Sequence, residues 1–165
     1  MFNLDYASIF QSIPREIATV LIATIPIAEL RVAIPVALGS FNLSALSAYF
    51  WAVLGNILPI IFILWWLEPV SRWLSKRFRL FNRFFSWLFK RTRNRHSQRF
   101  ERWGALALIT FVAIPLPITG AWTGSVAAFV FGIPFKKALP LIFIGVLIAG
   151  LVVTLVSLGI FSFIS

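Results

Sequence analysis

Four long apolar blocks, separated by short polar links and one basic segment, dominate the 165-residue sequence. They cover residues 17–39, 45–67, 105–134 and 138–164. A helix needs about 20 apolar residues to cross the roughly 30 Å hydrocarbon core of a bilayer, and each block has that length. The chain is 60% hydrophobic with a mean hydropathy of +0.94, more apolar than a water-soluble domain of this size requires. The sequence therefore predicts an all-α integral membrane protein.

Two of the four blocks are broken in the middle. The first contains the stretch TIPIAELRVAIP, which places Glu29 and Arg31 between Pro26 and Pro35. The third contains PLPITGAWTG at 115–124, where polar residues and glycines again interrupt the apolar run. The second and fourth blocks have the pattern of ordinary spanning helices, and the second is flanked by aromatic residues typical of membrane interfaces. These aromatic residues are Tyr49, Trp51, Trp65 and Trp66.

Two topologies fit the broken blocks. Either all four blocks cross the membrane, or the first and third are re-entrant hairpins whose arms of about 12 residues reach roughly 18 Å. In the hairpin topology Pro26, Pro35, Pro115 and Pro117 mark the points where helix stops and turn begins. Irregular backbone cannot face lipid, so the two hairpin tips must meet near the midplane.

The positive charges favour hairpins. Eleven of the 15 Lys and Arg residues lie between Arg72 and Arg102, which the positive-inside rule assigns to the cytoplasm. A hairpin in the third block then keeps Lys136 and Lys137 on the cytoplasmic side, whereas four plain spans would export them. The N-terminus carries Asp5 and no basic region, so it does not resemble a cleaved signal peptide.

The basic segment has the pattern of an amphipathic helix in the membrane interface. Its apolar face is formed by Leu74, Phe78, Phe81, Phe85 and Leu88. A helix that docks onto a partner protein is the alternative. The residues expected to contact lipid headgroups are Lys76, Arg79, Arg83 and Lys90.

The two halves resemble each other. Residues 25–39 align with residues 114–128, and Gly55 then aligns with Gly145. The identities are few, but the order of elements repeats: a broken block, a short link and a full span. Repeats related by an axis in the membrane plane are common in transporters. We therefore expect one membrane domain over 1–165, an inverted repeat of two units, each a re-entrant hairpin and a transmembrane helix (13–68 and 104–165), joined by a basic amphipathic cytoplasmic linker (69–103).

Glu29 and Arg31 are the main candidates for function. A charge inside the membrane costs about 2.5–3.5 kcal/mol on insertion scales unless it finds a partner or water. Three interpretations of the pair are open: an ion pair that only holds the hairpin, two charges at the membrane surface, and a substrate and proton site, which we favour. In the last case Glu29 exchanges a proton and Arg31 holds an anionic headgroup.

The second tip would supply the opposite wall of that site. Thr119 and Thr123 offer hydroxyls, and a helix starting near Ala121 would aim its amides at an anion. Trp122 either stacks on a substrate or fills the tip, and Asn56, on the first full span, is more easily explained by an interhelical hydrogen bond. Gly120 and Gly124 permit close approach, either of a substrate or of another helix. The predicted site comprises Glu29, Arg31, Asn56, Thr119, Gly120, Trp122, Thr123 and Gly124.

Other functional classes find little support. The chain has no cysteine, and its one histidine, His96, lies in a basic stretch that indicates a solvated loop. No nucleophile–base pair, metal cluster or phosphate-binding loop is present in the sequence, so no catalytic residue, metal or cofactor is expected. The basic charge belongs to one segment of a membrane protein, which makes nucleic acid an unsuitable partner.

The strings AELRVAIP, GNILP at 55–59 and PLPITGAWTG resemble those of the small multidrug export family of bacterial inner-membrane proteins, over nearly the whole chain. More distantly, the layout is similar to the DedA/VTT superfamily, whose members have facing re-entrant hairpins and include lipid-carrier flippases and scramblases. Those proteins carry an acid in one hairpin and an arginine in the other, whereas Glu29 and Arg31 both lie in the first.

The expected function is a multi-pass inner-membrane transporter or exporter, not an enzyme. It would be coupled to protons and move or flip an amphipathic substrate, either drug-like or an anionic lipid. Membrane lipids are expected partners. Six helical segments would shield two hairpin tips only poorly from lipid, and this favours a homodimer. The alternative is a membrane-organising or lipid-binding protein that transports nothing.

Overall fold

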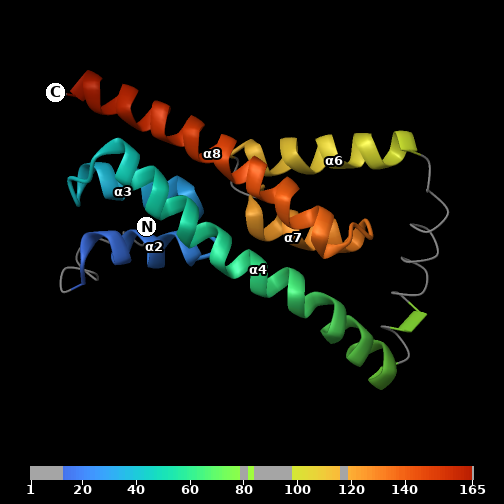
Figure 1. Ribbon diagram of the computed structural model, residues 1–165. Helices are drawn as coiled ribbons and strands as arrows, with labels where there is room; N and C mark the ends of the chain where they lie inside the picture. Colours follow the sequence, from blue (N-terminus) through green and yellow to red (C-terminus); the bar gives the residue numbers. More distant parts are fainter. Residues whose placement is uncertain (1–12, 79–81, 84–97, 116–118, 165) are drawn as a thin grey trace.

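The protein is all helical in the part of the chain that its computed structural model describes, residues 13–78, 82–83, 98–115 and 119–164 (Figure 1). Two of the helices are long and apolar enough to cross a membrane, over Ala45–Ser71 and Phe135–Phe163. They correspond to the second and fourth apolar blocks, the two that the sequence predicts to be ordinary spanning helices. The helices are α2 (Arg15–Thr24), α3 (Glu29–Gly39), α4 (Ala45–Arg77), α6 (Gln98–Ala113), α7 (Ala121–Val130) and α8 (Phe135–Ile164).

The two long helices, α4 and α8, turn most of their apolar side chains outward. Only 33% and 44% of their most apolar stretches are buried, whereas the core helix of a water-soluble protein would be mostly buried. Outward residues such as Trp65, Trp66 and Leu155 suit a lipid environment. Tyr49 differs from the predicted interfacial belt, because its hydroxyl donates to the carbonyl of Leu147 at 3.1 Å and so joins α4 to α8.

The first broken block folds into a helix–turn–helix pair, α2 and α3, which we call the first pair. Ile25 has extended backbone, as expected directly before Pro26, and this ends α2. The outer ends of the pair lie together, because Arg15 Nη1 donates to the carbonyl of Phe41 at 3.0 Å. With 10 and 11 residues, α2 and α3 are each about 15–17 Å long, roughly half of a hydrocarbon core.

Pro35 does not end a helix, and the prediction that it would is wrong. It lies inside α3, which continues to Gly39 although residue 35 has no N–H to donate to the carbonyl of Arg31. The helix persists because Leu30, Ile34 and other residues of one face are buried in the core. Prolines also lie inside α4 (Pro59 and Pro69) and α8 (Pro140).

The third block supplies the second pair, α6 and α7. As predicted, α6 ends before Pro115, at Ala113; Pro117 lies outside the described residues. In Figure 1 the first pair lies toward one end of the two long helices and the second pair toward the other.

Glycines allow the short helices to approach the long ones. A Cβ at Gly55 of α4 would lie 2.8 Å from the Cα of Val20 in α2. A Cβ at Gly145 of α8 would lie 2.7 Å from the Cβ of Val112 in α6. The two glycines that align in sequence therefore occupy comparable positions, where the long helix of each half meets the first short helix.

The connection between the halves differs from the predicted linker at its start. α4 passes through Pro69 without a break and ends at Arg77, so residues 69–77 continue the spanning helix. Lys76 and Arg83 are exposed. Most of the predicted amphipathic helix, including Arg79 and Lys90, lies outside the described residues.

Candidate functional site

Glu29 is the first residue of α3 and has an unusual backbone. Its φ of 46° falls in the left-handed region, which is uncommon for residues other than glycine and costs about 1–3 kcal/mol. Its N–H donates to the carbonyl of Ile25 at 2.9 Å, which closes the turn after α2. The residue is only 4% exposed, so the surrounding structure holds both its strained backbone and its carboxylate.

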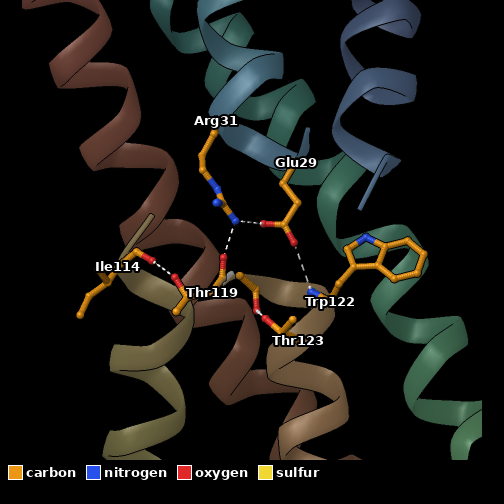
Figure 2. A network of polar contacts seen from close by, with 7 residues as sticks. Glu29, Arg31, Ile114, Thr119, Trp122 and Thr123 are labelled. Atoms are coloured by element: carbon orange, nitrogen blue, oxygen red, sulfur yellow. Dashed lines mark hydrogen bonds and ion pairs between the residues drawn. The ribbon is translucent and has the colours of Figure 1, made fainter. Parts of the chain in front are cut away.

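Arg31 joins Glu29 to the second pair. Its Nη2 atom lies 3.1 Å from Glu29 Oε2 and also donates to the carbonyl of Thr119 (Figure 2). The Arg31 side chain is 20% exposed and that of Glu29 6%. The sequence predicted that the two tips meet, and these contacts bring residues 29–31 against residues 119–122.

The Glu29 carboxylate also lies at the N-terminus of α7. The backbone N–H of Trp122 donates to Glu29 Oε1 over a long distance of 3.4 Å. The first N–H groups of a helix have no partner within the helix and carry partial positive charge, so this position favours an anion. Glu29 is therefore bound between a guanidinium and a helix N-terminus.

Gly120 makes this approach possible. It has a φ of 155°, and a Cβ at this position would lie 2.7 Å from Cδ and Oε1 of Glu29. Any side chain at residue 120 would occupy the space that the carboxylate now fills. Gly120, which the sequence predicts to permit a close approach, thus accommodates the Glu29 carboxylate.

We expect Gly120→Ala to destabilise the protein clearly. The left-handed φ alone costs about 1–3 kcal/mol for a residue with a Cβ, and the displaced carboxylate adds to this. Thermal unfolding in detergent measures the effect. Gly104→Ala is the matched control, because no atom lies within 4 Å of a Cβ built there. Equal unfolding temperatures for the two variants would contradict this account of Gly120.

A small cavity of about 10 Å³ lies beside the acid–base pair. Its polar walls come from Glu29, Arg31, Asn56 and Thr119, and Gly120 also lines it. Apolar residues form the rest of the lining; they are Leu30, Val112, Pro115, Ala121, Val146, Ala149 and Val153. A space of this size corresponds to about one water molecule.

The remaining predicted residues have other roles in the structure. The hydroxyl of Thr119 donates to the carbonyl of Ile114 at 2.6 Å and that of Thr123 to the carbonyl of Gly120 at 3.3 Å, so both satisfy backbone groups. Gly124 meets Val112 of α6, which is a helix–helix contact. Trp122, Thr123 and Gly124 do not line the cavity.

The Trp122 ring does not point at the acid–base pair. In Figure 2 the indole extends away from Arg31, toward α4. It is partly buried against the hydrophobic core, and its Nε1 has no hydrogen-bond partner among the described residues. This position agrees with the reading in which Trp122 fills the tip rather than stacks on a substrate.

Sequence reasoning missed the wall that α8 contributes. Val146, Ala149 and Val153 recur at three and four residues and face the cavity from the second long helix. They look like any apolar residues of a spanning helix, and no sequence signal distinguished them. Ala121 was expected only as a helix start.

These features define a class: a helical membrane protein in which two short helix pairs meet at a buried acid–base pair between two long apolar helices. The chain belongs to the family described as "Putative small multi-drug export protein", whose model matches residues 29–152. The match covers most of the chain and includes every residue of the predicted site. It confirms the family resemblance noted from the sequence, and the description of the family is that of an export protein rather than of an enzyme. No curated protein and no solved structure matches the chain.

Proposed function

We propose that the protein is a proton-coupled transporter of the bacterial inner membrane that moves or flips an amphipathic substrate. One observation carries the proposal: an acid and a base, Glu29 and Arg31, are paired at the contact between the two tips, with Glu29 buried and Arg31 largely so. Intramembrane ionisable groups are costly and mark ion and substrate pathways in transporters. Membership in an export family supports the same function.

Each charge has a separate role in this proposal. Glu29 takes up and releases the proton, because a carboxyl is the group at the site that can change its charge. The Arg31 guanidinium binds the anionic headgroup of the substrate, while the apolar part of the substrate lies along the outward faces of α4 and α8. The 20% exposure of Arg31 supports this assignment, since the more exposed partner is the one that a ligand can reach.

The proposal includes two re-entrant hairpins in an inverted repeat. It is supported by the short length of α2 and α3, by the Arg15–Phe41 contact between their outer ends, and by the comparable contacts of Gly55 and Gly145. Under this topology the tips lie near the midplane, where the long helices shield the irregular backbone from lipid.

Labelling of single cysteines tests the topology. The chain has no cysteine of its own, so Ser40→Cys and Lys136→Cys each introduce one reactive thiol at an exposed position. We expect a membrane-impermeant maleimide to label them from opposite faces of inverted and right-side-out vesicles. Labelling of both from one face would support four plain spans instead.

A flux measurement in proteoliposomes tests the function. We expect an imposed pH gradient to drive movement of a fluorescent amphipathic anion, and a voltage alone to drive much less. Absence of any flux, together with loss of cellular function when Arg79, Arg83 and Lys90 are neutralised, would favour the membrane-organising alternative.

A further inference from the structure

Asn56 is a buried amide whose side-chain oxygen is not satisfied by the described residues around it. It lies on α4 and is only 1% exposed, and its Oδ1 has no hydrogen-bond partner among the described residues. Buried side-chain oxygens almost always have a partner, either protein or ordered water. The interhelical hydrogen bond expected from the sequence is therefore not formed through this oxygen.

Asn56 lines the same cavity as Glu29. The volume of about 10 Å³ suits one water molecule. A buried water needs two to four polar partners, and Glu29, Arg31, Asn56 and the Thr119 backbone supply them. Among the described residues that line the cavity, Arg31 is the charged group that faces Glu29; α6 and α8 contribute valines and an alanine.

We propose that this cavity binds one water molecule that donates one hydrogen to Asn56 Oδ1 and the other to the Glu29 carboxylate. This water is the immediate donor and acceptor of the Glu29 proton. Hydronium at the water site transfers one proton to the carboxylate, leaving a neutral water and a carboxylic acid, and the reverse step releases the proton. Asn56 is a positioning residue, because it holds the water while touching no substrate. The proton-transfer half of the proposal rests on the proposed function, and the water site itself does not.

A structure of the wild-type protein in lipid nanodiscs, at a resolution that shows ordered water, tests the site directly. We expect one density peak within hydrogen-bonding distance of both Asn56 Oδ1 and Glu29. Direct contact between the two side chains, or a cavity without density, would overturn the water site. Because this experiment measures no flux, its result is independent of whether the protein transports anything.

Substitution of Asn56 by leucine tests the role in proton exchange. Leucine has a similar shape without the amide. If Oδ1 had no partner, its removal would raise the unfolding temperature. We expect the unfolding temperature to fall, because the variant removes a hydrogen-bond partner that holds the water, and Glu29 then loses the water as well. We also expect the proton-driven flux to drop by about 10- to 100-fold, the size of losing one hydrogen bond to a charged group. Ser125→Ala is the control, since Ser125 is buried and hydrogen-bonded but does not line the cavity.

Infrared difference spectroscopy adds a readout that a structural role alone would not change. The C=O stretch of protonated Glu29, identified by its absence in Glu29→Gln, should move to higher wavenumber in Asn56→Leu, because the acid has lost its hydrogen-bonded water. The band should stay in place in Ser125→Ala. An unmoved band and unchanged flux in Asn56→Leu would overturn the positioning role even if the water is present.

Discussion

Glu29→Gln should abolish proton-driven flux and leave a folded protein. Glutamine keeps the shape of the side chain and can still accept from the Trp122 N–H, but it cannot bind and release a proton. Groups that transfer protons typically contribute 10²- to 10⁴-fold to a rate, so we expect flux under a pH gradient to fall by about 100-fold or more. The measurement is uptake in proteoliposomes at several pH values, with wild-type protein reconstituted at the same density.

The fold should survive this change for a physical reason. Arg31 loses its anionic partner but keeps its bond to the Thr119 carbonyl and its 20% exposure. Glu16→Gln, in the first turn of α2, is the matched control and should transport normally. Flux in Glu29→Gln that still follows the pH gradient would remove Glu29 from the mechanism.

Arg31→Met should destabilise the protein more than any other single change at the site. The variant leaves the 6%-exposed Glu29 carboxylate without its guanidinium and removes the link to the second tip. Removing one partner of a buried ion pair costs about 3–5 kcal/mol, and the partial exposure of Arg31 places the expected loss near the lower end. Thermal unfolding in detergent at neutral pH measures it.

A double variant separates the charge from the contact. Glu29→Gln combined with Arg31→Met removes both charges, so it should recover much of the stability lost by Arg31→Met alone while remaining unable to transport. Arg77→Met, at the exposed end of α4, is the control and should unfold within about 0.5 kcal/mol of wild type. No recovery in the double variant would show that the bond between Arg31 and Thr119, rather than charge pairing, holds the tips together.

Sequence alone predicted an all-helical chain, its two long apolar helices and the breaks in the other two apolar blocks. Prolines combined with charged or polar residues within the apolar runs indicated the breaks in the first and third blocks, because intramembrane polar groups and interrupted backbone need partners within the protein. The same argument predicted that the tips would meet, and Arg31 and Thr119 do make contact. Pro35 was misjudged because tertiary packing of α3 outweighs the one backbone bond that it removes.

The finer geometry of the site could not be predicted. Thr119 contributes its carbonyl rather than its hydroxyl, and that choice depends on the position of Ile114 in three dimensions. The left-handed backbone of Glu29 has no signal in the residue type, since only glycine and asparagine commonly favour that region. Whether the side-chain oxygen of Asn56 finds a partner among the described residues depends on neighbours from four different elements, which no local pattern encodes.

The unbroken passage of α4 beyond its apolar stretch matters for how the protein meets the headgroups. Between Ser71, where that stretch ends, and Arg77, where the helix ends, six residues add about 9 Å of rigid rod. This is close to the distance of about 8 Å over which physiological salt screens a charge. Lys76 and Arg77 therefore lie about one screening length beyond the apolar stretch. Their attraction to acidic phospholipids will strengthen steeply as the ionic strength is lowered.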